Sequence, residues 1–477
     1  MKGVISSIFF LITGFVVGQF PSRFLSVQEM TQDLDSLLAT IEAAHPDPTA
    51  YCGESAWIQA QALAQQQIQS PMSTAAFGWV ISEMLGTLQD SHTQLNYGSY
   101  WRKHLNQGGR VLPIRKRGKW VVKAPLAGLN PGDSLVSING WSIDQIDLIS
   151  KTFAMTEGES DVSELRMTDA LFSLIMAPFV IQNKDSAVIV YQNPDGKTIR
   201  KSVATMGLKE WEAYLKKQDS DKEKAQFTIE GGIGILTIPS FAPKRFGQQH
   251  RIIQRAFRKI KNQGLDSLVI DLRNNAGGLS TEVEYLYSYL DTQGHNTPHN
   301  IISKSSRLAQ TRYPLLNKKW IQKSILYLFQ KQENIYNYVF LRSQPFGKQD
   351  TVYFHQNFIQ KRNVFNGTLI LWVNGLSASA AVDFTHAVRL NRRGQIWGEP
   401  IMGGMKGTFG NTTAMTLPNS QLQIQISTIR YNYDASWLYD PVPLSPDIVI
   451  EITREDLIKD RDAFKEVLKK RSNLRTP

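Results

Sequence analysis

Apolar residues recur every three or four positions in the first part of the chain. Between Ser26 and about Leu88 this spacing is helical, and the run His45–Pro48, with its two prolines, ends the first helix. Two further helices are predicted at roughly 54–69 and 73–88. These elements form a predicted N-terminal helical unit.

The pattern changes to short alternating strands after residue 110. Residues 111–122 and 134–138 alternate between apolar and polar side chains, and Asn130–Asp133 and Asn139-Gly140 are turn signals. They predict a small β-rich module that ends near Ala204. The remaining predicted features of this region are a helical insertion at 160–183 and a charged linker or exposed loop at 216–224.

Near-continuous apolar runs mark the last large unit. They lie at 233–238, 268–272 and 368–373, and such runs are typical of strands buried on both faces. Helices at 246–262 and 380–391 complete an order of strand, helix, strand, helix that indicates an α/β core. Strands are predicted near 412–431. Thr453, with Asp456 three residues later, caps a final amphipathic helix through Leu457, Ile458, Phe464, Val467 and Leu468.

The composition is that of a globular protein of two to three domains. The 477 residues are 42% hydrophobic, which excludes a disordered or fibrous chain. Cys52 is the only cysteine, so an intrachain disulfide and a cysteine-based metal site are excluded. The eight histidines include no pair at metal-ligand spacing on an apolar frame. No metal and no cofactor are therefore expected.

The first eighteen residues have the pattern of a secretory signal. Lys2 precedes an apolar stretch at 4–17, and Val16 and Gly18 stand where a signal peptidase reads before Gln19. A membrane anchor is the alternative, but the stretch is short for a span of roughly 20 residues. We expect an exported chain, periplasmic or extracellular, without an integral span after cleavage.

A hydroxyl-bearing turn follows the apolar run at 368–373. In Asn374–Ala381, Ser379 stands between a strand and a helix, where free N–H groups of the helix N-terminus can stabilise an anion. Ser379 is thus a candidate nucleophile. The alternative is that Ser377 or Ser379 is only an N-cap.

Two other segments carry candidate chemistry. Asp271–Gly278 follows a strand, and its small residues leave backbone N–H groups accessible for an oxyanion hole, or simply form a tight turn. His92 has a hydroxyl residue on either side as the chain leaves a helix, which suits a base as well as a surface or capping residue. His386, inside the helix after Ser379, is interpreted as structural.

In their order along the chain, these segments resemble the tail-specific, or C-terminal processing, serine peptidase family, in particular its tricorn-core-like branch. The segments that carry the resemblance are Asp90-Ser91-His92-Thr93, a PDZ-like stretch at 129–140, Asp271–Gly278, Ser377–Ala381, Gly398-Glu399-Pro400 with Gly403-Gly404, and Ser445–Ile448.

The resemblance assigns roles to residues. It implies that Ser379 is the nucleophile and that the N–H groups of Gly277 and Ala380 form the oxyanion hole. It also places a Ser-His pair at Ser91 and His92.

The other family positions match this sequence less closely. The carboxylate before the Pro-Asp motif falls at Asp440, where the tricorn pattern has Glu. A second branch of the family uses a lysine after Gly-Glu-Pro, and Lys406 lies two residues beyond that position, as an alternative base. The acidic residue that usually follows the nucleophile turn is Val382 here, with Asp383 one place later.

The resemblance implies a secreted or periplasmic serine peptidase that acts on peptides or proteins. His92 accepts the proton of Ser379, an acyl-enzyme forms, and the PDZ-like module either captures substrate C-termini or serves as a spacer. The alternatives are a catalytically inactive peptide-binding relative and a lipid or retinoid carrier built on the same core.

The implied architecture is a crotonase/ClpP-like α/β core with two additional modules. Its predicted segments are a signal peptide at 1–18, a helical unit at 19–100, a PDZ-like module at 105–206, a core at 207–452 with a basic insertion at 292–364, and a C-terminal helix at 453–477.

The net charge of +11 is concentrated in that insertion. Residues 301–364 hold eleven Lys and Arg, opposed only by Glu333 and Asp350. Basic and aromatic residues together also occur in proteins that bind single-stranded nucleic acid. In an exported peptidase a lid or a clamp for acidic peptides is favoured over a nucleic-acid site. A solvated helical insert is the default interpretation, and no nucleic-acid partner is expected. The aromatic residues are Trp320, Tyr327, Phe329, Tyr336, Tyr338 and Phe340.

Overall fold

The computed structural model of the chain describes residues 23–124, 128–222, 224–291, 300–311, 344–353, 361, 363–433 and 442–473. The predicted signal peptide at 1–18 and most of the basic insertion, with its six aromatic residues, lie outside the described residues. In the described part, no helix is long and apolar enough to cross a membrane.

Three helices near the N-terminus confirm the first predicted elements. Ser26 and Ser73 begin two of them, because each serine hydroxyl accepts a hydrogen bond from a backbone N–H of the first turn. β1 (Phe24–Leu25) pairs with β2 (Met72–Ser73) and ties the start of the unit to its last helix. The helices are α2 (Val27–Ala44), α3 (Glu54–Gln67) and α4 (Thr74–Gly86), and α5 (Tyr97–Asn106) follows.

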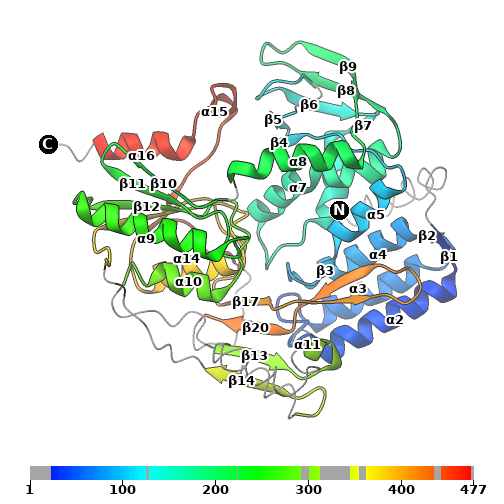
Figure 1. Cartoon of the computed structure of the whole chain (residues 1–477). Coiled ribbons are helices and arrows are strands. Elements are labelled where there is room, and N and C mark those ends of the chain that lie inside the picture. The colour runs from blue at the N-terminus through cyan, green and yellow to red at the C-terminus, as the bar shows by residue number, and fades with distance from the viewer. Residues whose placement is uncertain are drawn as a thin grey trace.

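The β-rich module is a twisted antiparallel sheet with two helices beside it (Figure 1). Its strand order is β4-β5-β6-β8-β9, and β7 pairs with β6. The predicted strand at 111–122 is instead a pair of short strands, because Gly118 turns the chain with a φ of 56°. The strands are β4 (Arg115–Arg117), β5 (Trp120–Lys123), β6 (Ser134–Ile138), β7 (Trp141–Ser142), β8 (Ser186–Gln192) and β9 (Thr198–Ala204).

Two helices of this module lie next to each other in sequence. They are α6 (Ile143–Phe153) and α7 (Asp161–Met176), and α7 continues into a π-helical turn at Ala177–Ile181. The predicted helical insertion at 160–183 is therefore confirmed.

The prediction of a linker at 216–224 is wrong. Residues 208–222 form helix α8 (Leu208–Lys222). Lys, Glu, Ala and Leu favour a helix, and buried Trp211 anchors this one by an edge contact with Trp101. A single apolar anchor in a polar segment gives too weak a periodicity to reveal the helix.

The core is a six-stranded sheet with helices on both faces, which confirms the predicted α/β class. The order is β10-β11-β12-β15-β16-β21, and every pair except β10–β11 is parallel. The strands are β10 (Gln226–Glu230), β11 (Ile233–Thr237), β12 (Ser267–Asp271), β15 (Thr368–Val373), β16 (Gln395–Gly398) and β21 (Ile448–Val449).

Alternate residues of these strands pack on opposite faces of the sheet. Leu268 and Ile270 of β12 lie in the cluster with α9 (Phe246–Asn262), α10 (Ser280–Tyr287) and α14 (Ala380–Leu390). Val269 lies in the other cluster, which contains Trp372 and Phe464. The two clusters sandwich the sheet and hold the carboxyl ends of its strands in place.

The final predicted helix is capped as expected but is broken in two. Thr453 and Asp456 form the capping box that begins α15 (Arg454–Ile458). The chain then turns at Asp460, whose φ is 49°, and α16 (Ala463–Asn473) begins after it. An aspartate in the left-handed region ends a helix, and apolar spacing alone does not detect such an interruption.

Two smaller sheets join the core to the rest of the chain. One has the order β14-β13-β20-β17, and the other has the order β18-β19-β3. Because β3 belongs to the N-terminal unit, its pairing with β19 connects that unit to the core. The strands are β3 (Gln94–Leu95), β13 (Asn300–Lys304), β14 (Gln349–Tyr353), β17 (Gly407–Gly410), β18 (Thr413–Thr416), β19 (Gln423–Ile426) and β20 (Ile429–Asn432), and α11 (Arg307–Thr311) follows β13.

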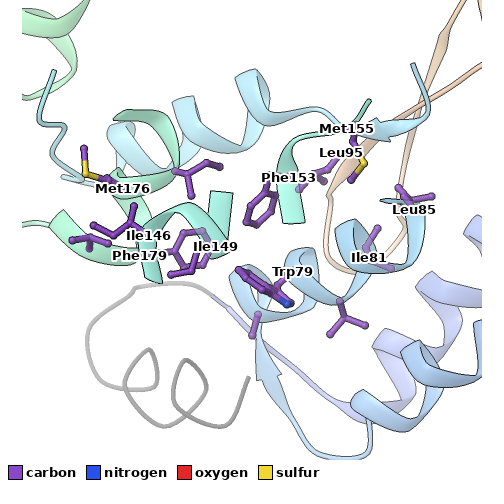
Figure 2. Close-up of a cluster of buried hydrophobic side chains, with 14 of the residues drawn as sticks. Trp79, Ile81, Leu85, Leu95, Ile146, Ile149, Phe153, Met155, Met176 and Phe179 are labelled. Carbon is purple, nitrogen blue, oxygen red and sulfur yellow. The ribbon is translucent and has the colours of Figure 1, made fainter. Parts of the chain in front are cut away.

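One hydrophobic cluster runs through the helical unit, the β-rich module and the β18–β19 arm. Figure 2 shows part of it, where Trp79 of α4 lies beside Phe153 and Phe179. Ile424 of β19 is fully buried in the same cluster. The helical unit is thus packed against the core by apolar burial as well as by strand pairing.

Candidate active site

Ser379 occupies a strained turn between β15 and α14. Its φ is 53° and its ψ is −122°, a conformation that a side-chain-bearing residue adopts only at a free-energy cost. The hydroxyl of Ser379 does not cap α14, whereas Ser377 is buried and donates to the carbonyl of Leu272 at 2.9 Å. Ser377 therefore stabilises the turn, and the partly exposed Ser379 hydroxyl is left for chemistry.

The glycine turn lies directly against this serine. A Cβ atom on Gly277, whose φ is 95°, would be 2.6 Å from Ser379 Cβ and 2.8 Å from the backbone N of Ala380. Ala380 is the first residue of α14, so its N–H has no acceptor within the helix. The two sequence motifs thus meet at one point, with one backbone donor available beside Ser379.

The second predicted oxyanion donor is already engaged. Gly277 N–H donates to Asn275 Oδ1 at 2.8 Å, and the Asn275 amide nitrogen donates to the carbonyl of Ile238 at 2.9 Å. Asn275 is fully buried. The Gly277 N–H must leave or share this bond before it can bind an oxyanion.

His92 lies on a loop that a buried carboxylate organises. Asp90 accepts from His45 Nε2 at 3.0 Å, from Thr93 Oγ1 at 2.5 Å and from the backbone N of His92 at 2.8 Å. Burial alone would raise the pKa of Asp90, but the His45 hydrogen bond and nearby positive charge lower it to about 2. Asp90 therefore carries its charge throughout the working pH range.

Strand pairing and a side-chain bond fix this loop on the core. Thr93 Oγ1 accepts from the backbone N of Ser427 at 3.0 Å, just after β19. The pairing of β3 with β19 starts two residues after His92. The core therefore determines the position of His92, although His92 belongs to the helical unit.

Glu157, between α6 and α7, holds His92 and Ser91. Its Oε2 accepts from Ser91 Oγ at 2.7 Å and lies 3.4 Å from His92 Nδ1, and Ser91 Oγ lies 3.1 Å from the same nitrogen. Its Oε1 accepts from the backbone N of Phe409 at 2.7 Å. Sequence reasoning missed Glu157, because a single glutamate in a polar loop carries no local signal.

The carboxylates around His92 stabilise its protonated form. Burial by itself would lower the pKa of His92, but the Glu157 hydrogen bond and the charges of Glu157, Asp90 and Asp383 raise it above the ordinary value. His92 remains 21% exposed. The ring is thus accessible and more basic than an ordinary histidine.

Asp383 is a buried carboxylate on the helix that follows Ser379. It lies one turn beyond Ser379 on α14 and accepts from the Tyr433 hydroxyl at 2.6 Å. Burial raises the pKa of Asp383 to about 6, whereas the Tyr433 hydrogen bond and the charge of His92 act in the opposite direction. Asp383 is the acidic residue found one place late in the sequence motif.

The structure brings some predicted residues together and leaves others apart. Among the described residues, no hydrogen bond joins Ser379 to His92 or to Lys406. Lys406 lies just before β17, and its carbonyl accepts from the backbone N of Tyr433 at 2.8 Å. His386 is buried and stacked on Tyr433, which agrees with a structural role. Asp440 lies outside the described residues.

Asp90, His92 and Glu157 also meet the geometric requirement of a metal site, with ligand atoms within 4.8 Å of one another. Backbone and side-chain donors already occupy the oxygens of both carboxylates. The cluster is therefore a hydrogen-bonded support for the imidazole.

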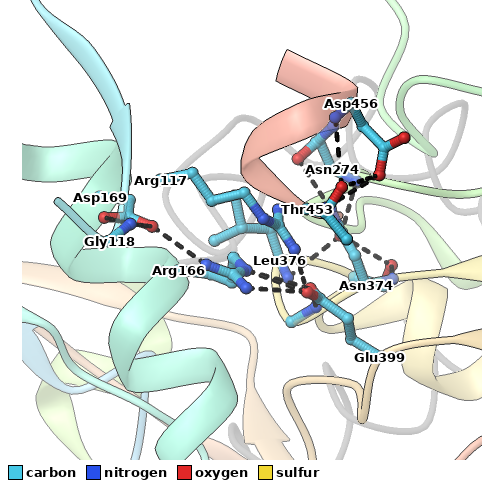
Figure 3. Close-up of polar contacts among 12 residues, drawn as sticks. Arg117, Gly118, Arg166, Asp169, Asn274, Asn374, Leu376, Glu399, Thr453 and Asp456 are labelled. Atoms are coloured by element: carbon cyan, nitrogen blue, oxygen red, sulfur yellow. Dashed lines mark hydrogen bonds and ion pairs between the residues drawn. The ribbon is translucent and has the colours of Figure 1, made fainter. Parts of the chain in front are cut away.

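Glu399, from the Gly-Glu-Pro motif, connects the β-rich module to the nucleophile turn (Figure 3). It pairs with Arg117 of β4 and with Arg166 of α7, whose Nη2 is 2.9 Å from Glu399 Oε1. Glu399 Oε2 also accepts from the backbone N of Gly375 at 3.3 Å. Arg117 and Arg166 of the module thus fix Glu399, and Glu399 in turn binds the backbone of the turn that carries Ser379.

The core of the chain matches a known protein family. Residues 232–450 match the model of peptidase family S41. No curated protein matches the chain.

Among solved structures, a point mutant of CPAF is 14% identical with a TM-score of 0.68, over 93% of this chain and 96% of that one. Mature CPAF complexed with lactacystin is 14% identical with a TM-score of 0.64, over 94% and 98%. The photosystem II D1 C-terminal processing protease is 17% identical with a TM-score of 0.43, over 89% and 93%. At such identities the two CPAF structures show a shared fold.

Proposed function

We propose that the chain hydrolyses peptide bonds through an acyl-enzyme on Ser379, and the match of residues 232–450 to peptidase family S41 supports a serine-type peptidase. The observation that carries this proposal is the arrangement of three segments: the strained Ser379 turn, the Gly277 turn packed against it, and the His92 loop, which strand pairing and Glu157 fix on the core.

His92 is the proposed general base. Ser91 Oγ donates its own proton to Glu157, so its oxygen can accept a hydrogen bond from the N–H at His92 Nδ1. This arrangement selects the tautomer with a lone pair on Nε2, the nitrogen that takes the proton of Ser379. The imidazolium that forms is stabilised by Glu157 and by the charge of Asp90. It then protonates the leaving amine, and water completes the hydrolysis by the same route.

The oxyanion is proposed to form beside the N-terminus of α14. Ala380 N–H and the positive end of the helix dipole stabilise the oxyanion without any rearrangement. Gly277 N–H adds a second donor when it exchanges Asn275 Oδ1 for the substrate oxygen. The small side chains of the turn let the scissile carbonyl approach.

Replacement of Ser379 by alanine tests this proposal. The Ser379→Ala protein should lose cleavage of casein and of peptide libraries, and also labelling by a serine-reactive phosphonate. Ser99→Ala, at an exposed position on α5, is the control for loss of a serine hydroxyl, and it should leave turnover and labelling unchanged. Turnover that persists in Ser379→Ala would disprove the assignment, and an active-site serine that labels without turnover would indicate an inactive relative.

Recognition of substrate C-termini is a finer proposal and rests on the PDZ-like sequence at 129–140. An extended peptide can add a strand to a sheet edge while backbone N–H groups bind its terminal carboxylate. Peptides with a free C-terminus should then be cleaved faster than the same peptides with a C-terminal amide. Equal rates would leave the module as a spacer.

Export is proposed from the sequence of residues 1–18. N-terminal sequencing of the protein recovered outside the cytoplasm should begin at Gln19. A chain that begins at Met1 and remains in the cytoplasm would contradict this proposal.

A further inference from the structure

His45 is a buried histidine to which the proposed mechanism gives no role. It directly follows α2, and its backbone N–H donates to the carbonyl of Ile41 at 2.9 Å. Its side chain is completely buried. A buried imidazole costs free energy unless both of its nitrogens find hydrogen-bond partners. The partners of these two nitrogens therefore indicate what the ring does.

The two ring nitrogens of His45 have opposite hydrogen-bonding roles. Nδ1 accepts from the backbone N–H of Asp47 at 3.1 Å. A ring nitrogen that accepts a hydrogen bond carries no proton, so the ring proton is on Nε2. Nε2 lies 3.0 Å from Asp90 Oδ2 and is the donor of that bond. Neither side chain of this pair is exposed, so solvent does not compete for the bond.

The carboxylate of Asp90 extends this contact to the loop of His92. Its Oδ1 accepts from the backbone N–H of His92 at 2.8 Å, and its Oδ2 accepts from Thr93 Oγ1 at 2.5 Å as well as from His45. Among the described residues, His45 is the only donor to this carboxylate from outside the loop. His45 therefore ties the orientation of the carboxylate, and with it the backbone of His92, to the end of α2.

The ring of His45 is itself held in place by the core. Its centroid lies 4.6 Å from that of Phe409 in β17, and the backbone N–H of Phe409 donates to Glu157. The residues that follow His45 add two contacts with the same sheet. Asp47 pairs with Arg430 of β20 at 2.7 Å, and the Tyr51 hydroxyl donates to the carbonyl of Gly407 at 3.0 Å. The imidazole is thus a fixed point from which Asp90 can be oriented.

We propose that His45 is a positioning residue for the proposed base, His92, and that it acts through the hydrogen bond from its Nε2 to Asp90. The proposal deepens the peptidase function and rests on the role of His92 as the base. A base transfers a proton efficiently only within a narrow range of positions, and residues behind it set that range.

Two substitutions separate the two hydrogen bonds of His45. The amide nitrogen of glutamine reaches about as far as Nε2, so His45→Gln can still donate to Asp90 but no longer accepts from Asp47. The side chain of asparagine reaches about as far as Nδ1, so His45→Asn can accept from Asp47 but cannot reach Asp90. Each variant loses the ring and one bond. The two variants therefore differ mainly in the contact with Asp90.

The kinetics of peptide cleavage give the first readout. His45→Asn should lower kcat by about 10-fold to 100-fold with KM unchanged, because the base is displaced and the substrate contacts are not. His45→Gln should keep kcat within about threefold of the wild type, because the donor to Asp90 remains. Equal kcat values in the two variants would overturn the proposal. If His45→Asn shows no cooperative thermal transition, a larger loss of kcat in His45→Gln would overturn it alone.

Hydrogen exchange gives a readout that needs no turnover. The backbone N–H of His92 is bonded to Asp90, so it should exchange faster in His45→Asn and at the wild-type rate in His45→Gln. Mass spectrometry of the segment 90–95 measures this. Unchanged exchange in both variants would overturn the proposal. His104→Asn, at another buried histidine near the end of α5, is the control for loss of a buried imidazole and should leave kcat and this exchange unchanged.

This proposal and the proposed function can fail separately. Equal kcat values in the two His45 variants, together with loss of turnover in Ser379→Ala, remove the role of His45 and keep the peptidase mechanism. Turnover that persists in Ser379→Ala removes the mechanism, whatever the exchange of His92 shows.

Discussion

The imidazole of His92 is surrounded by negative charge, and this has two opposite effects on catalysis. In the proposed mechanism, Glu157 and Asp90 stabilise the imidazolium that His92 forms. The same carboxylates raise the pKa of His92, so more of the resting enzyme carries a protonated ring that cannot accept a proton. Activity should therefore rise with pH through a midpoint above the ordinary histidine value of about 6.5.

Glu157→Gln separates these effects. The amide keeps the size of the side chain and removes its charge, so the pKa of His92 falls and the acidic limb of kcat/KM moves to lower pH. The imidazolium also loses support, and kcat should fall by about 100-fold, within the range of general-base effects. Profiles of rate against pH for the wild type and the variant measure both changes.

Glu212→Gln, at an exposed position on α8, is the control for loss of one negative charge. It should leave the profile in place. A lower kcat with an unmoved acidic limb in Glu157→Gln would mean that Glu157 acts only on packing.

At the scale of elements, the glycine turn and the serine turn touch so closely that position 277 has no room for a side chain. Gly277→Ala places a methyl group 2.6 Å from Ser379 Cβ and 2.7 Å from the Ala378 carbonyl. One of the two turns must move, so peptide turnover should drop by at least about 100-fold, as a displacement near 1 Å is enough for such a loss.

Gly264→Ala is the matched control for this change. Gly264 also has a positive φ, 61°, but no atom lies within 4 Å of its added methyl group. It should cost about 1 kcal/mol of unfolding free energy and leave turnover unchanged. Similar losses of activity in both variants would mean that backbone strain, and not the contact with Ser379, causes the loss.

The Glu399 contacts are the second coupling between elements. Arg117 and Arg166 are only 15% and 13% exposed, so Glu399→Gln leaves the poorly solvated Arg117 without its partner and Arg166 paired with Asp169 alone. We expect a loss of about 3–5 kcal/mol in unfolding free energy, measured by urea denaturation. Glu230→Gln, which breaks the more exposed pair with Lys465, should cost less than about 1 kcal/mol. Equal losses of unfolding free energy in the two variants would show that burial does not strengthen the Glu399 ion pairs.

The whole molecule is expected to unfold as one unit, because the helical unit and the core arm share a hydrophobic cluster. Phe77 of α4 and Ile424 of β19 are both fully buried in it. Phe77→Ala and Ile424→Ala should each destabilise the protein by about 2–5 kcal/mol and lower the same thermal transition. Calorimetry measures this, and two transitions that shift independently would show that the halves fold separately.

The same packing explains how a peptidase site forms from distant segments. His92 comes from the helical unit, Glu157 from the β-rich module and Ser379 from the core. Loss of the shared cluster therefore separates the segments that form the site. Stability and activity are thus linked at the scale of the whole chain.

Local patterns were sufficient to predict most of the elements and to indicate a candidate nucleophile. The apolar runs predicted β11, β12 and β15, and the small residues after β15 predicted an accessible serine at a helix N-terminus. These predictions succeed because periodicity, small side chains and capping residues directly express backbone conformation.

The order of these motifs along the chain carried the family resemblance. The same local reasoning failed at α8 and at the break between α15 and α16. The buried side chain of Trp211 anchors α8, and the left-handed backbone of Asp460 separates α15 from α16.

Only the tertiary structure decided how the proposed base, His92, is held. Glu157 and Ser91 are 66 residues apart, and no spacing in the sequence relates them. The hydrogen bond from Gly277 N–H to Asn275 and the one from Tyr433 to Asp383 are equally invisible in the chain. The sequence by itself determined most of the elements and the place of the candidate nucleophile. Packing decided the surroundings of His92 and their electrostatics, because charges act through space between residues that only the folded chain brings together.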